Sequence, residues 1–169
     1  VEALKADQTI LSNWPEKIEQ DQILLEEALL GPRQYRVMVH HRNMPDQPPR
    51  WLEVDVIAGD QGLKLAVSPH MAGPSADEIF AGHLATTRFL EAVTGASPSG
   101  YVVGLAAGQV HRMEQVLLKP SQTVSGMLWL RAMAGSGSLR VQARTFDNLD
   151  GLTIKPWDST ARTARGTFP

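Results

Sequence analysis

Apolar positions along this chain follow two different spacings. Leu4, Leu11, Ile18 and Leu25 are seven residues apart, a helical spacing, but Pro15 interrupts the run, so a new helix is better placed after Ser12-Asn13. Pro15 fits the first turn of such a helix, Glu16 complements its dipole, and Gly31-Pro32 is typical of a helix end. We therefore predict a helix from Pro15 to Gly31. Residues 1–14 are predicted to form a leading helix or linker.

After this stretch, apolar and polar residues alternate, which is typical of strands with one buried face. Strands are predicted at residues 35–42, 51–57 and 63–67. The last two are separated by residues 58–62, whose glycines predict a hairpin turn.

A second helix signal follows. Ser75 and Glu78 have the spacing of a capping box, so we predict a helix from there to residue 93, ending at Gly95. Four strands are predicted after it, at residues 101–106, 110–118, 124–134 and 138–146. Residues 134–137 are predicted to turn the last pair.

The two predicted halves can be overlaid. Residues 54–65 align with 130–141, which places Ala58-Gly59 on Ala134-Gly135. Glycines recur at turns for local reasons, so coincidence stays an alternative. The interpretation adopted here is a single α+β domain at 15–146, a duplicated α-β-β-β unit with halves 15–67 and 75–143. Its mostly antiparallel strands are packed by two main helices, and residues 147–169 form an extended C-terminal tail.

Composition narrows the class of protein. The 169 residues carry a formal net charge of −2, which argues against nucleic acid as the main partner. The chain has no cysteine, which excludes thiolate catalysis, cysteine-based zinc sites and disulfides. No apolar run approaches the roughly 18 residues of a membrane helix, so no membrane insertion is expected within this segment. The first residue is Val1, so an upstream leader, membrane anchor or preceding domain stays open, and with it the compartment.

Candidate catalytic and metal-ligating residues lack a familiar motif. The five histidines have none of the known zinc spacings, so neither a metal site nor a cofactor is expected. A site built from His40, His70 or His111 with a carboxylate is the alternative. Glu53 and Asp55 share one predicted strand face, where two carboxylates can divide acid and base roles. The alternative catalytic set is Glu53, Asp55, His40 and His111.

Charge placement is more informative. The first predicted hairpin carries Glu53 and Asp55 on its outer face, whereas the second carries arginines. This predicts one acidic and one basic sheet face, with tryptophans as aromatic anchors of the kind that interfaces favour. The candidate binding residues are Arg36, His40, Arg42, Trp51, Trp129, Arg131, Arg140 and Arg144.

These features favour a non-enzymatic protein-binding or assembly module, such as a scaffold subunit, a secretion adaptor or a chaperone-like protein. Its expected partners are another protein, a second copy of the chain, or both. The alternative is a small-molecule enzyme or ligand carrier with a pocket between the two halves.

Overall fold

The fold is dominated by strands. The structure is a computed structural model, and it describes residues 6–95, 100–148 and 165–168. Within these residues one helix, α1, spans Glu78–Val93. The strands are β1 Gln8–Ser12, β2 Lys17–Ile18, β3 Gln22–Leu30, β4 Arg33–Asn43, β5 Arg50–Ser75, β6 Tyr101–Leu105, β7 Val110–Leu118, β8 Thr123–Arg144 and β9 Arg165–Phe168.

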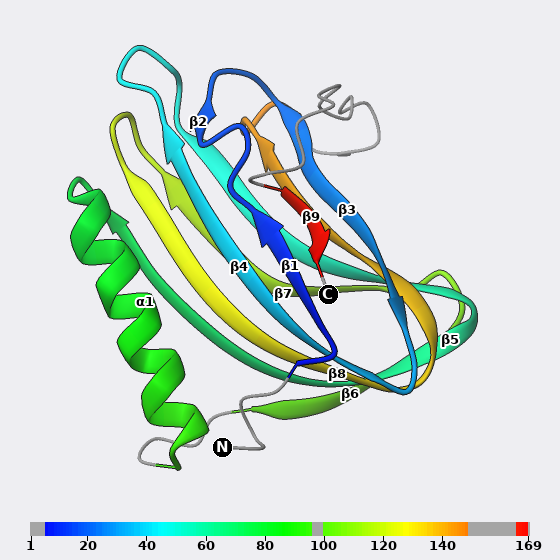
Figure 1. The fold of residues 1–169 in the computed structure, drawn as a ribbon. Helices are drawn as coiled ribbons and strands as arrows, with labels where there is room; N and C mark the ends of the chain where they lie inside the picture. The colour runs from blue at the N-terminus through cyan, green and yellow to red at the C-terminus, as the bar shows by residue number, and fades with distance from the viewer. Residues whose placement is uncertain (1–5, 96–99, 149–164, 169) are drawn as a thin grey trace.

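All the described strands belong to one mixed sheet that folds over itself. The long strands β5 and β8 pair with each other along most of their length and curve together at one corner (Figure 1). On one side of the corner lie β7, the first part of β5, the last part of β8, and β3; we call this the β3–β7 half. On the other side the order is β6, β5, β8, β4, β1, β9, and we call this the β4–β6 half. A single hydrophobic cluster takes side chains from both halves, so the core lies between them.

Glycines shape the corner. Gly62 and Gly135 have φ angles of 73° and 83°, a region that side chains rarely adopt. A Cβ on Gly135 would lie 2.1 Å from the carbonyl oxygen of Gly62, so the two backbones cross where no side chain fits. The predicted hairpins at 58–62 and 134–137 are therefore wrong. Each glycine stretch bends a continuous strand, and the two bends pair with each other.

The predicted helix from Pro15 to Gly31 is also wrong, because this segment forms β2 and β3. Strand β3 contains a register shift between Ile23 and Leu25. The resulting bulge at Leu24 changes which residues face the core on either side of it. Buried side chains therefore fall at Ile18, Gln22, Leu24, Leu25 and Leu29, so the segment lacks the simple alternation that indicates a strand.

The second predicted helix is confirmed as α1, with a different cap. The Asp77 side chain accepts a hydrogen bond from the backbone N–H of Phe80 at 2.9 Å, which makes Asp77 the N-cap. Ser75 instead accepts from the N–H of Asp77. Helix α1 lies along one side of the sheet (Figure 1) and contacts β5 and β8 through Ala81, Ala85 and Phe89. Among the described residues, no helix has the length and apolar character needed to cross a membrane.

The predicted fold class is thus corrected: the described chain is mostly strand with one helix, and it is not a duplicated α-β-β-β unit. The predicted strands at 35–42, 101–106 and 110–118 are confirmed as β4, β6 and β7. Residues Gln8–Ser12, predicted as part of a leading helix or linker, form β1, which pairs in parallel with β4. In the predicted tail, Arg165–Phe168 pairs with β1 as β9, and residues 149–164 lie outside the described residues.

Candidate functional site

The candidate functional side chains lie mostly on the outer face of the β4–β6 half. This face points away from the core and is partly covered by α1. Strand β4 buries Tyr35, Val37, Val39 and His41, so the alternate residues Arg36, Met38, His40 and Arg42 face outward. Across the ladder, His40 is opposite Ser125 of β8 and Arg36 is opposite Trp129. The Phe89 ring of α1 lies 6.4 Å from the Trp129 ring, which places the helix on this same face. Two sites lie here, one near each end of α1.

Near the start of α1, three potential metal ligands meet. A carboxylate oxygen of Glu16, a ring nitrogen of His40 and a carboxylate oxygen of Glu78 all lie within 4.8 Å of one another, and each residue is partly exposed. Glu16 precedes β2, His40 is on β4, and Glu78 is the first residue of α1. We call these three residues the Glu-His-Glu cluster.

Neighbouring groups orient the Glu-His-Glu cluster. The Nδ1 atom of His40 lies 2.6 Å from the Ser125 hydroxyl, so Nε2 is the nitrogen left for another partner. Burial lowers the pKa of His40, against an opposing effect of the nearby Glu16 charge, so the ring is neutral at pH 7. Arg42 forms an ion pair with Glu78. The Glu16 carboxylate has no hydrogen bond or ion pair with a described residue.

Near the end of α1 the sheet face is left open. A hollow of about 310 Å³ is lined by Ala66, Val67, Ser68, Gly100, Tyr101, Val102, Trp129 and Arg131. A second hollow of about 240 Å³ shares Ser68 and Trp129 with it and reaches Ala92 and Val93 of α1. We call the two together the Trp129 groove. Apolar side chains dominate its lining, and Val102 is 59% exposed.

Arg131 lines the Trp129 groove, Arg36 of β4 lies opposite Trp129, and the edge strand β6 carries two residues of the lining. Neither Arg131 nor Arg36 forms an ion pair with a described residue. The buried Nε of Arg36 has no hydrogen-bond partner, although one of its terminal nitrogens donates to the Thr9 hydroxyl at 3.3 Å. Strand β6 pairs only with β5 among the described strands, so one side of its backbone is unpaired there.

Comparison with protein-family models, curated proteins and solved structures finds no match. The function is therefore argued from the geometry of this chain.

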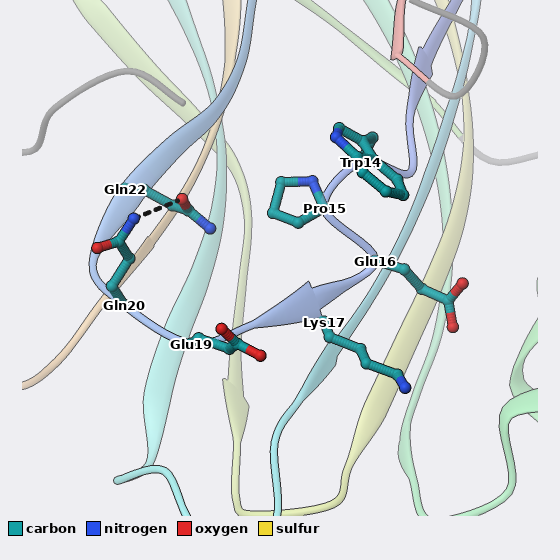
Figure 2. Close-up of a pocket in the computed structure, with 7 residues that line it drawn as sticks. All are labelled: Trp14, Pro15, Glu16, Lys17, Glu19, Gln20 and Gln22. Atoms are coloured by element: carbon teal, nitrogen blue, oxygen red, sulfur yellow. Dashed lines mark hydrogen bonds between the residues drawn. The ribbon is translucent and has the colours of Figure 1, made fainter. Parts of the chain in front are cut away.

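A further hollow, of about 590 Å³, lies around the loop that joins β1, β2 and β3. Figure 2 shows its lining residues: Trp14, Pro15, Glu16, Lys17, Glu19, Gln20 and Gln22. Gln20 and Gln22 hydrogen-bond to each other at 3.4 Å, while the Glu16 side chain points away from them. This hollow therefore lies next to the Glu-His-Glu cluster. The Glu16 carboxylate does not contact Gln20 or Gln22.

The predicted acidic and basic faces do not exist as separate surfaces. Glu53 is fully buried and accepts two hydrogen bonds from Arg144, at 2.6 and 2.9 Å. Arg112 contacts both Glu53 and Asp55 at 2.8 Å. Burial alone would raise the pKa of Glu53, but hydrogen bonds from Arg144, Gln142 and Gln115 and the Arg112 charge together lower it. Acids and bases alternate on one face and neutralise each other.

The other predicted site residues are scattered. Arg140 pairs with Glu26 at 2.8 Å, and the Trp51 ring packs against Phe146. His111 lies 2.9 Å from the Tyr101 hydroxyl. The alternative catalytic set is not brought together, because His40 and Glu53 lie opposite Ser125 and Gln142, near opposite ends of β8. Of the predicted binding residues, the structure gathers Arg36, Trp129 and Arg131 at the groove and His40 and Arg42 at the cluster.

Sequence reasoning missed Glu16 and Glu78 as partners of His40. Both were interpreted as helix-end residues, and Glu78 does begin a helix. No spacing in the chain links the three, because they come from three separate elements. The only available signal was the outward position of His40 on a predicted strand.

Proposed function

We propose that this protein binds an extended, acidic segment of a partner protein in the Trp129 groove, alongside β6. The observation that carries the proposal is the combination of an apolar hollow beside Trp129 with two arginines that have no acidic partner among the described residues. Arg131 lines the hollow, and Arg36 of β4 lies opposite Trp129. This is the protein-binding role that the sequence favours, now assigned to one surface.

Each part of the groove matches one part of such a ligand. The unpaired backbone of β6 offers N–H and C=O groups to an added strand, a common mode of peptide recognition. Tryptophan in a partly enclosed pocket is typical of the residues that dominate binding energy. Arg131 is exposed, and its guanidinium can pair with a carboxylate on the ligand. Together these groups favour a ligand with one apolar anchor and flanking Asp or Glu residues.

The proposal is tested by selecting ligands from a random peptide display library and measuring the affinity of a synthesised consensus peptide by fluorescence polarisation. We expect the consensus to contain an apolar residue next to acidic ones. Trp129→Ala should weaken binding by about 30-fold, which corresponds to the loss of a hot-spot residue of about 2 kcal/mol. Arg131→Glu should also weaken it, with a smaller effect at high salt.

Lys119→Glu is the matched control, because Lys119 is exposed in the turn between β7 and β8 and carries the same charge. It should leave the affinity unchanged. Peptides that bind Trp129→Ala and Arg131→Glu as tightly as the original protein would refute the proposal. A dimer that forms at micromolar concentration and dissociates on Trp129→Ala would assign the groove to a second copy of this chain instead.

A further inference from the structure

The Glu-His-Glu cluster holds more negative charge than its protein surroundings balance. Glu16 and Glu78 place carboxylate oxygens within 4.8 Å of each other, and Arg42 pairs with Glu78 alone. Two carboxylates this close repel each other unless a cation lies between them.

The backbone holds the three groups in place. The backbone N–H of Arg42 donates to the backbone oxygen of Glu16 at 2.7 Å, which fixes the loop before β2 against β4. The Asp77 cap fixes the first turn of α1, from which Glu78 projects. The cluster is therefore built by the fold and does not depend on a flexible terminus.

The Ser125 hydroxyl supplies a second, independent indication. When Nδ1 of His40 carries the ring proton and donates it to Ser125, Nε2 keeps a lone pair that is available to a metal ion. A histidine that ligates a metal ion almost always donates its other ring N–H to an oxygen acceptor, usually a carboxylate, a backbone carbonyl or water. Ser125 thus has the position and the chemistry of an orienting residue.

We propose that Glu16, His40 and Glu78 bind one divalent transition-metal ion of the zinc class. A ligand set of one imidazole nitrogen and two carboxylate oxygens suits zinc, whereas calcium and magnesium prefer oxygen ligands alone. Three protein ligands leave a coordination position for water or for a group of a bound molecule. The free oxygen of Glu78 ligates the ion while Arg42 holds the other. The site is separate from the Trp129 groove, and the inference does not rest on the proposed function.

The test is titration calorimetry of the full chain with zinc chloride, with magnesium and calcium chloride as comparisons. We expect one zinc ion per chain and much weaker binding of the other two ions. Glu16→Gln, His40→Ala and Glu78→Gln should each weaken zinc binding by more than tenfold. Ser125→Ala should weaken it by about tenfold through loss of ring orientation. Thermal melting without zinc checks that each variant is folded.

Two further variants separate ligation from other effects. His83→Ala removes an exposed histidine on α1 outside the cluster and should bind zinc as the original protein does. Arg42→Gln should bind at least as tightly, because it removes a positive charge beside the ion. Zinc binding that survives His40→Ala, or its absence from the original protein at millimolar zinc, would overturn the proposal. An equal loss in Arg42→Gln and Glu78→Gln would show that Glu78 serves only as the ion-pair partner of Arg42.

Discussion

Lowering the pH should destabilise this fold in part through the fully buried imidazole of His41 on β4. The ring is 0% exposed. Its Nδ1 lies 2.8 Å from the carbonyl oxygen of Pro15, which can only accept, so Nδ1 carries the proton. Its Nε2 lies 2.8 Å from the Ser12 hydroxyl, which therefore donates to it. Both nitrogens are satisfied with the ring neutral. A second proton would reverse the hydrogen bond with Ser12 and place a positive charge in the core.

The magnitude follows from the pKa. Burial lowers the pKa of His41 from 6.5 to about 4, helped by the neighbouring His40 and opposed by the Pro15 carbonyl. The folded state thus binds this proton less tightly than the unfolded chain does. Stability is complete above pH 6.5 and falls as the pH drops toward 4. Each unit of pKa difference is worth about 1.4 kcal/mol, so the loss reaches about 1.4 kcal/mol at pH 5.5 and about 3 kcal/mol near pH 4.

The assay is urea unfolding of the original protein and of His41→Asn at several pH values between 7.5 and 4.5. Asparagine keeps a donor for the Pro15 carbonyl but cannot titrate, so the variant should be less stable at pH 7.5 and less sensitive to pH. Burial also lowers the pKa values of His40 and His70, and both variants retain these residues. The difference between the two pH profiles therefore isolates His41. Parallel profiles would refute the reasoning.

Two further predictions concern the stability of the sheet, and each has a matched control. Gly135→Ala should lower the free energy of unfolding in urea by more than about 2 kcal/mol, because its Cβ would meet the backbone at a positive φ. The control Gly104→Ala should be neutral or slightly stabilising, because nothing lies within 4 Å of its Cβ. A similar cost for both would contradict the role of the corner. Glu53→Gln should lower the free energy of unfolding by about 3–5 kcal/mol, because it leaves Arg144 without its buried anionic partner. The control Glu26→Gln should lower it by at most about 1 kcal/mol, since the Glu26 side chain is 46% exposed. Equal losses would show that burial of the Glu53 ion pairs does not matter.

The sequence predicts some of the regular elements of this fold. Strand β4 and helix α1 have local patterns that agree with their final environment: simple alternation for the strand, and a cap with a glycine after the last turn for the helix. Strand β3 shows where this fails. Its bulge at Leu24 interrupts the alternation of buried residues, and its pairing with β8 makes it a strand.

The prediction of hairpins at the corner of the sheet is wrong for another reason. The glycines around Gly62 and Gly135 allow the backbone to turn, but a bend and a hairpin use the same residues. The outcome depends on the close crossing of β5 and β8, which brings together residues more than seventy positions apart. The similarity of the two stretches reflects this mutual contact and not a repeated unit.

The two charge clusters of the molecule differ in how completely the protein satisfies them, and this difference decides their roles. Glu53 accepts hydrogen bonds from Arg144, Gln142 and Gln115, so its charge is balanced by residues of the same sheet. Such a closed network stabilises one strand arrangement and leaves nothing for a ligand. At the other cluster, Glu16 has no protein partner among the described residues, and His40 keeps one nitrogen available. Both clusters contain paired carboxylates, but only the second presents unsatisfied acceptors at the surface, and unsatisfied acceptors are what a cation requires.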